Sequence, residues 1–316
     1  MRVLFAGTPD IAVPSLRALA GKHEVVGVLT NPDSRQGRGK KVHHSPVKEA
    51  ALELGLNVLQ PVKLNGEFRD IVKDLNPDIL VCFAYSKIFG PLFMSLFPRG
   101  GINLHPSKLP DLRGASPLNS IILRGDRETA ITVQTLAQEM DSGDILLQKP
   151  LVIDDRETTH SLAERVANEG GSCLLEVLDG LESGRITPVP QDHSKATFCS
   201  LIGKNDGLVD WKKPAVELDR VVRAYSPWPH GFTFWKGQRL NILEACPYDG
   251  GTQTDTPGQV TGLDKKEGIL IQTGDGILAV SRLQLQSKKA LDFKSFLNGS
   301  KDFINSVLGA EDDLKN

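Results

Sequence analysis

The chain has 316 residues, of which 40% are hydrophobic and 24% charged, and its formal net charge is −2. These values are ordinary for a globular protein and exclude a polycationic chain, so nucleic acid could be bound only through local basic patches. The length favours one large domain and a smaller one.

The four cysteines are scattered and form no CxxC pair. This spacing argues against a zinc site and against a disulfide scaffold, and it fits a reducing compartment. No apolar run reaches the length of a membrane span, and the first predicted strand starts too early for a signal peptide. We therefore expect a cytoplasmic protein that holds no metal and binds no membrane.

The N-terminal part alternates apolar runs with segments of helical spacing. Residues 3–6 form an apolar run that Gly7 ends, residues 11–19 have helical spacing, and residues 24–29 are β-rich again. Since parallel strands need crossovers, this order predicts a doubly wound, mostly parallel, Rossmann-like α/β sheet. Further helices are predicted over residues 46–54, 68–75, 116–123 and 158–181, and further strands over residues 78–84, 101–104 and 130–136.

The pattern changes after about residue 190. Residues 190–206 are polar and turn-rich, which is typical of a linker. A helix is predicted over residues 214–225, followed by short alternating segments separated by glycine turns. Such segments predict a small OB-like β-barrel. The predicted organisation is an α/β domain over residues 1–189, a linker over residues 190–206 and a β-rich domain over residues 207–316.

The stretch "NPDSRQGRGKKVHHSPVK" is rich in basic residues and carries two glycines. Its cations include Arg35, Arg38, Lys40 and Lys41. Most charge runs are solvated surface loops, but a flexible basic loop also binds phosphates. The composition leaves both interpretations open.

The stretch "INLHPSKLPDLRGASP" begins at the carboxyl end of a predicted strand, the edge at which ligands bind in open α/β sheets. Asn103 and His105 are two residues apart, so on an extended chain their side chains point the same way. Pro106 keeps His105 extended. We therefore regard Asn103 and His105 as a candidate catalytic pair.

The stretch "EMDSGDILLQ" contains Asp141 and Asp144 on either side of a Ser-Gly pair. One interpretation is a hairpin or β-turn. The other is a carboxylate that orients His105 and tunes its pKa. Spacing alone does not choose between the two aspartates.

Six motifs, found in one order along nearly the whole chain, resemble those of the methionyl-tRNA formyltransferase family. They are "FAGTPD", "GRGKK", "SPVK", "INLHPSKLPDLRGASP", "DSGDIL" and "RAYSPWP". The Asn-x-His, Leu-Pro and Asp motifs resemble those shared by all transferases and hydrolases that use 10-formyltetrahydrofolate. The basic loop and the "PWP" segment narrow the resemblance to the tRNA enzymes.

The resemblance implies transfer of a formyl group from 10-formyltetrahydrofolate to the α-amino group of methionine on initiator tRNA, by a monomer and without a metal. It implies that Asn103, His105 and Asp141 are catalytic, with Asn103 and His105 as N–H donors to an oxyanion. It also implies folate contacts and tRNA contacts. The folate turn comprises Ser107, Lys108, Leu109 and Pro110, and the tRNA-binding loop includes Arg35, Arg38, Lys40 and Lys41.

By the same resemblance, the C-terminal domain is a tRNA-binding module. Arg223 is one of its basic candidates. Two alternatives predict different behaviour. A folate-dependent formyltransferase acting on a small amine, such as an amino sugar, turns over without RNA. A non-catalytic RNA-binding protein binds tRNA but transfers no formyl group.

Overall fold

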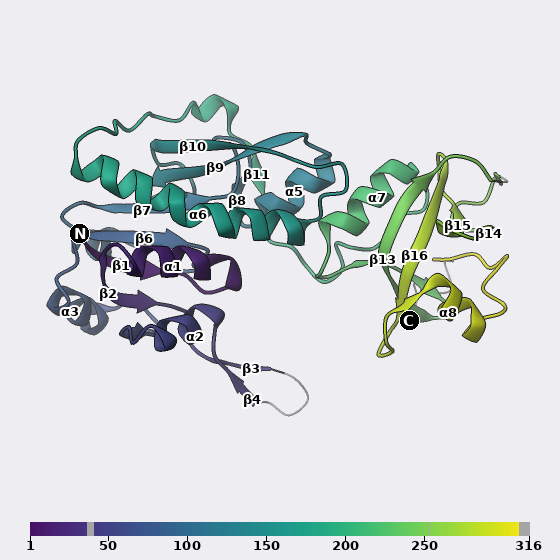
Figure 1. The fold of residues 1–316 in the computed structure, drawn as a ribbon, viewed down its shortest axis with the longest axis horizontal. Helices are drawn as coiled ribbons and strands as arrows, with labels where there is room; N and C mark the ends of the chain where they lie inside the picture. The colour runs from purple at the N-terminus through teal and green to yellow at the C-terminus, as the bar shows by residue number, and fades with distance from the viewer. Residues whose placement is uncertain (37–40, 252, 310–316) are drawn as a thin grey trace. The chain divides into compact units, whose positions relative to one another are not determined.

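The computed structural model describes residues 1–36, 41–251 and 253–309, and the chain forms two compact units (Figure 1). The first unit comprises residues 1–117, 128–153 and 162–200. The second comprises residues 118–127, residues 154–161 and the chain from Leu201 onward. The predicted boundaries at residues 189 and 207 stay a prediction.

The first unit is built on a seven-stranded sheet with the order β10-β9-β7-β6-β1-β2-β5. The five strands from β5 to β7 are parallel, whereas β9 is antiparallel to β7 and β10 is antiparallel to β9. The strands are β1 (Arg2–Ala6), β2 (Glu24–Leu29), β5 (Val58–Leu59), β6 (Ile79–Phe83), β7 (Gly101–His105), β9 (Glu128–Thr135) and β10 (Ile145–Val152).

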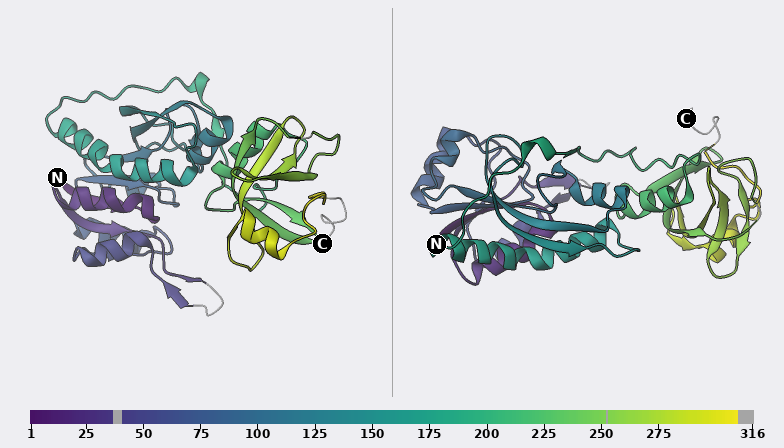
Figure 2. Two further views of the ribbon diagram at one scale, coloured as in Figure 1. Left: turned by 45° about the vertical axis from the view of Figure 1, so that its right-hand side comes forward. Right: turned by 90° about the horizontal axis from the view of Figure 1, so that it is seen from above.

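Helices cover both faces of this sheet, which confirms the predicted doubly wound class. On one face, α1 and α6 lie side by side (Figures 1 and 2), and a Cβ built on Gly170 of α6 would lie 3.2 Å from Ser15 Oγ of α1. On the other face, α3 and α4 pack their phenylalanines against Leu4 and Leu80. The helices of the first unit are α1 (Val13–Ala20), α2 (Pro46–Glu53), α3 (Gly66–Asp74), α4 (Pro91–Met94) and α6 (Thr159–Glu182), with 3-10 turns η1 (Asp10–Ala12) and η2 (His193–Lys195).

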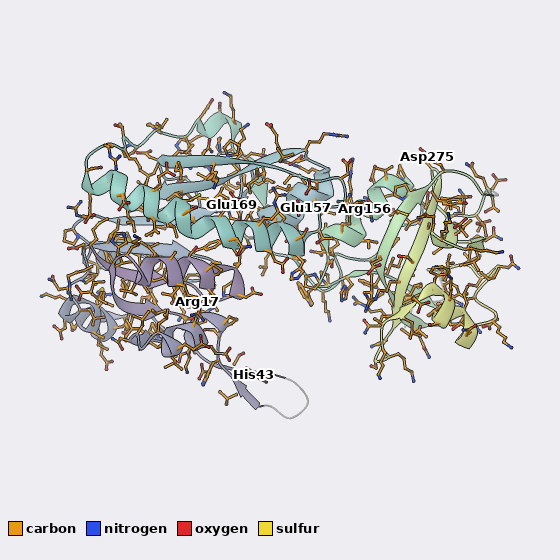
Figure 3. All side chains as sticks on the ribbon, in the orientation of Figure 1. Arg17, His43, Arg156, Glu157, Glu169 and Asp275 are labelled. Atoms are coloured by element: carbon orange, nitrogen blue, oxygen red, sulfur yellow. The ribbon has the colours of Figure 1, made fainter. Side chains whose placement is uncertain are left out.

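Local sequence explains these elements. All five residues of β6 are apolar and buried, as expected for a central parallel strand. The side chains of Ser45 and Asn65 accept hydrogen bonds from the backbone N–H of Lys48 and Phe68, and so cap α2 and α3. Glu169 of α6 forms an ion pair with Lys149 of β10 at 2.9 Å, which ties this helix to the edge of the sheet (Figure 3).

Two short strand pairs complete the first unit. β8 (Arg113–Gly114) pairs in parallel with β11 (Phe198–Cys199). β3 (Ser34–Gln36) and β4 (Lys41–His43) pair antiparallel.

The second unit is an antiparallel sheet domain with the strand order β12-β13-β16-β15-β14, and β17 pairs with β16. This arrangement confirms the predicted class of the C-terminal part. Its core contains Trp211 and a group of aromatic side chains, in which the ring centroids of Trp235 and Phe303 lie 5.1 Å apart. The elements are α5 (Pro117–Arg124), α7 (Ala215–Ala224), β12 (Gly231–Trp235), β13 (Gln238–Tyr248), β14 (Val260–Asp264), β15 (Gly268–Gln272), β16 (Ile277–Leu285), β17 (Leu291–Asp292) and α8 (Phe293–Gly299).

Candidate active site

Asn103 and His105 point at one carboxylate, that of Asp141. Both residues lie on β7, and strand geometry continues to His105 as the sequence predicts. Asn103 Nδ2 lies 3.3 Å from Asp141 Oδ1, and His105 Nδ1 lies 3.5 Å from Asp141 Oδ2. The structure therefore brings together the three residues that the sequence analysis assigned to catalysis.

Asp141 lies in the connection between β9 and β10, and its backbone has φ of +52°. The turn is tight, because a Cβ built on Gly143 would lie 1.8 Å from the carbonyl oxygen of Thr135. The segment is the turn of a hairpin, and it also places the Asp141 carboxylate beside His105, whose orientation by this carboxylate stays a prediction. Asp144 contributes its backbone, which exchanges hydrogen bonds with Thr135.

The ring of His105 is buried and held from both sides. Its Nε2 lies 2.8 Å from the carbonyl oxygen of Leu112. A carbonyl oxygen only accepts, so Nε2 carries a hydrogen and donates it. Nδ1 is then the ring nitrogen that faces Asp141. The expectation that an N–H of His105 meets an oxyanion therefore requires a proton on Nδ1.

Asp141 accepts two further hydrogen bonds. The backbone N–H of Gly114 donates to Oδ2 at 2.8 Å, and Gln134 Nε2 donates to Oδ1 at 3.0 Å. Sequence reasoning did not select Gln134. The available signal was weak, an amide in the β-rich run "AITVQTL", and the pairing of β7 with β9 places Gln134 opposite Asn103.

A cysteine also lies beside this group. Cys82 is the neighbour of Asn103 in the pairing of β6 with β7. Burial raises the pKa of its thiol to about 12. A thiol with this pKa is protonated at neutral pH, so Cys82 does not supply a thiolate nucleophile.

Comparisons with known proteins identify the family. The formyl transferase model matches residues 1–178, and the model of the formyl transferase C-terminal domain matches residues 201–301. A methionyl-tRNA formyltransferase from Treponema denticola is 48% identical over 96% of this chain and 98% of its own length. The chain belongs to the methionyl-tRNA formyltransferase family. The predicted family, fold class and enzyme class are thereby confirmed.

Two solved structures share the fold of this family member. A methionyl-tRNA formyltransferase from Clostridium thermocellum has a TM-score of 0.57 at 18% identity, covering 79% of this chain and 95% of that one. HypX from Aquifex aeolicus in complex with tetrahydrofolic acid has a TM-score of 0.64 at 18% identity. That match covers 96% of this chain and 48% of that one.

Most residues of the predicted folate turn are buried or make contacts within this methionyl-tRNA formyltransferase family member. Ser107 is buried, and its hydroxyl donates to the carbonyl oxygen of Asp111 at 2.6 Å. Leu109 is buried and precedes a cis peptide bond to Pro110. Lys108 is exposed and pairs with Glu128 at 3.1 Å. Ser107 and Leu109 are thus buried within the protein, and the contact of the four residues with folate stays a prediction.

The basic loop that marks the family lies, in the sequence, between the paired strands β3 and β4. Arg38 and Lys40 lie outside the described residues, whereas Arg35 and Lys41 belong to the paired strands. Asp33, before the hairpin, pairs with His44, after it, at 3.0 Å. Hydrogen bonds from Lys48 and then Gln60 lower the pKa of Asp33 from 3.8 to about 2. The carboxylate therefore stays charged at neutral pH and fastens the base of the hairpin.

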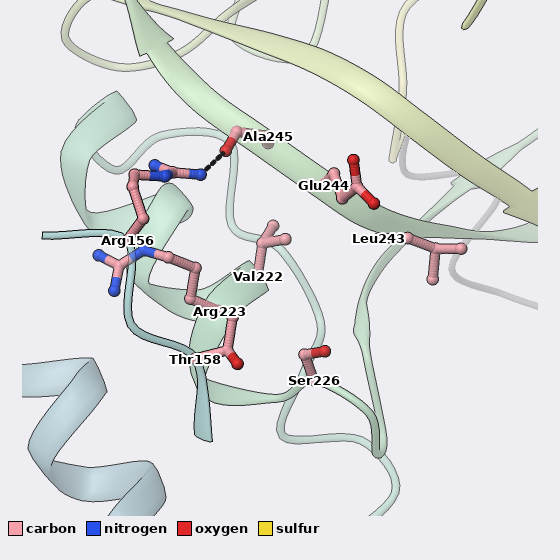
Figure 4. A pocket seen from close by; sticks show the side chains of 8 residues that line it. All are labelled: Arg156, Thr158, Val222, Arg223, Ser226, Leu243, Glu244 and Ala245. Carbon is pink, nitrogen blue, oxygen red and sulfur yellow. Dashed lines mark hydrogen bonds between the residues drawn. The ribbon is translucent and has the colours of Figure 1, made fainter. Parts of the chain in front are cut away.

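A small cavity in the second unit, of about 70 Å³, is lined by two arginines (Figure 4). Arg156 and Arg223 both donate to the buried carboxylate of Asp219, each at 2.8 Å. Arg156 also donates to the carbonyl oxygen of Ala245 at 2.6 Å. The guanidinium of Arg223 is mostly buried and forms an ion pair with Asp219. Because it is used inside the protein, Arg223 is a weaker candidate for a contact with tRNA.

Within residues 1–36, 41–251 and 253–309, no group of three or more His, Cys, Asp or Glu side chains is arranged to hold a metal ion. In the same part of the chain, no helix has both the length and the apolar character needed to span a bilayer.

Proposed function

We propose that this protein transfers the formyl group of 10-formyltetrahydrofolate to the α-amino group of methionyl initiator tRNA, producing N-formylmethionyl-tRNA. The observation that carries this proposal is the single carboxylate of Asp141, which both Asn103 and His105 face. The membership of the formyltransferase family and the fold shared with a tetrahydrofolate-bound protein support a folate co-substrate.

In this reaction the methionine amine attacks the formyl carbon with its lone pair. The new C–N bond forms while the carbonyl oxygen takes up negative charge, and the amine nitrogen must lose a proton. We assign this proton to Nδ1 of His105, because Nε2 already donates to the carbonyl oxygen of Leu112. Asp141 lies 3.5 Å from Nδ1 and stabilises the resulting imidazolium.

The developing oxyanion needs an N–H donor, and Asn103 supplies one. Its Nδ2 carries two hydrogens, and the contact with Asp141 uses one of them. Collapse of the tetrahedral intermediate breaks the bond between carbon and folate N10, and the N10 nitrogen takes the electron pair and the proton that His105 received from the amine. A lost oxyanion donor typically lowers the rate by about 10²–10³-fold.

The remaining assignments belong to the same proposal. The turn of Ser107, Lys108, Leu109 and Pro110 contacts the folate, and the loop with Arg35, Arg38, Lys40 and Lys41 contacts the acceptor end of the tRNA. The C-terminal domain binds tRNA as well. The protein acts in the cytoplasm as a monomer, with a catalytic domain over residues 1–189 and a tRNA-binding domain over residues 207–316.

The test is formyl transfer from 10-formyltetrahydrofolate to methionine-charged initiator tRNA, with methionine-charged elongator tRNA and free methionine run in parallel. We expect transfer to the initiator alone. Transfer to a small amine such as an amino sugar, with no transfer to any tRNA, would replace the proposed acceptor. Absence of transfer to every acceptor, with folate still bound, would overturn the proposal.

A further inference from the structure

A chain of buried amides runs from Arg113 to the carboxylate of Asp141, within the first unit. Arg113 is 3% exposed, Gln191 is 5% exposed and Gln134 is 1% exposed. Arg113 donates to Gln191 Oε1 from Nη2 at 2.7 Å and from Nε at 3.2 Å. Its Nη2 also lies 3.0 Å from His193 Nδ1.

The guanidinium fixes the direction of every amide that follows. An arginine side chain has donors but no acceptor, so Gln191 must turn its oxygen toward Arg113 and its Nε2 away from it. Gln191 Nε2 then donates toward Gln134 Oε1 at 3.2 Å. With its oxygen used, Gln134 presents its own Nε2 to Asp141 Oδ1 at 3.0 Å. Turning either amide over would place two acceptors or two donors against each other.

Gln191 also holds the backbone on which Asp141 stands. Its Nε2 lies 2.9 Å from the carbonyl oxygen of Asp141 and 2.6 Å from that of Gly143. This is the turn in which Asp141 has a positive φ. One glutamine, 50 residues away in the sequence, thus contacts the turn directly and reaches the carboxylate through Gln134.

We propose that Gln191 and Gln134 are positioning residues for formyl transfer, which act by holding the backbone and the carboxylate of Asp141 in place beside His105. This inference rests on the proposed catalytic role of Asp141. Buried polar networks of this kind are cooperative, and an unpaired member is costly. Displacing a catalytic group by about 1 Å lowers turnover by about 100-fold.

The test uses Gln191→Glu in the full-length protein, because this change keeps the size and the contact with Arg113 but removes the N–H donors. We expect kcat for formyl transfer to fall about 10- to 100-fold, with KM for folate and tRNA unchanged within about twofold. Gln134→Leu, which removes one donor, should lower kcat less. The matched control is Gln272→Glu, in the second unit, where a buried glutamine also donates to two backbone carbonyls of a turn.

The control variant should show a similar loss of thermal stability with kcat unchanged. Equal kcat in wild type, Gln191→Glu and Gln134→Leu would overturn the inference. If Gln191→Glu fails to fold, Gln134→Leu decides alone.

Asp141→Asn separates this inference from the function on which it rests. Wild-type turnover in Asp141→Asn would remove Asp141 from the mechanism, and with it the basis of the inference. If Asp141→Asn is inactive but Gln191→Glu and Gln134→Leu both keep the wild-type kcat, only the positioning role fails. In the residual activity of Asp141→Asn, adding Gln191→Glu should cause no further loss, because both changes act through one carboxylate. If Gln191→Glu lowers kcat as much in Asp141→Asn as in the wild type, the two residues do not act through one carboxylate.

Discussion

Asp141 Oδ2 lies 3.5 Å from Nδ1 of His105, while the opposite nitrogen of the same ring donates to a backbone carbonyl. The imidazole is thus fixed in orientation by the chain itself, and one nitrogen is directed at a carboxylate. In the proposed mechanism His105 is the proton acceptor, and the carboxylate of Asp141 lies beside the nitrogen that would be charged. This relationship also determines which substitutions are informative.

Replacing His105 with alanine removes the proton acceptor without removing Asn103 or Asp141. We expect kcat to fall by about 10²–10⁴-fold, the usual contribution of a general base. Binding of folate and of tRNA, measured separately by equilibrium titration, should stay near the wild-type values. A His105→Ala enzyme with wild-type turnover would exclude this residue from the mechanism.

Replacing Lys40 and Lys41 together with alanine tests the basic loop. We expect weaker binding of tRNA and a shallower dependence of its affinity on salt. With fewer phosphate contacts, binding releases fewer counterions. Folate affinity should hardly change. The measurement is the logarithm of the tRNA affinity against the logarithm of the salt concentration. A collapse of folate affinity would assign the loop to the other substrate.

Gly143→Ala tests the turn that presents Asp141. The new Cβ would lie 1.8 Å from the carbonyl oxygen of Thr135, which is backbone and cannot move aside cheaply. We expect a loss of about 1–3 kcal/mol in the free energy of unfolding, the range for overpacked sites, together with lower kcat. Gly299→Ala is the control, because nothing lies within 4 Å of its Cβ. Equal melting temperatures for both variants would contradict the tight turn.

Asp33→Asn tests the base of the hairpin through pH. The pKa of Asp33 is lowered from 3.8 to about 2 in the folded chain, so its ionised form stabilises the fold above about pH 3.8. The stabilisation is lost as the pH falls from 3.8 toward 2. Wild type should therefore melt at a higher temperature than Asp33→Asn at pH 5, and the gap should narrow toward pH 3. A gap that stays constant would show that this carboxylate makes no such contribution.

The sequence predicts the pair of Asn103 and His105 because alternation along a strand is a local property. It does not choose Asp141 over Asp144, since the choice depends on the backbone of a turn that is set by its neighbours. Gln191 gives no local signal either, because its contacts with Asp141 and Gly143 join distant parts of the chain. A polar residue that lies inside a turn-rich segment is indistinguishable from a solvated one until the fold is known.

Most of the longer elements were predictable, but α4, α8, β5 and β10 were among those not predicted. β10 was not predicted, although its sequence "ILLQKPLV" is mostly apolar. Pro150 interrupts the pattern, and proline is tolerated in strands mainly at the edge of a sheet. β10 is indeed the edge strand. The antiparallel direction of β9 and β10 also escaped prediction, because strand direction follows from the connections and not from the strand residues.

The second unit draws on three separate stretches of the chain, and this limits how it can be exchanged in evolution or by engineering. The carbonyl oxygen of Ala224 accepts hydrogen bonds from the side chains of Asn119 and Thr159, each at 2.7 Å. The carboxylate of Asp219 accepts a hydrogen bond from Arg156 at 2.8 Å. A fragment that starts in the predicted linker would lose all three donors. We therefore expect a transplanted second unit to be more stable when it also carries residues 118–127 and 154–161, which belong to the same compact unit.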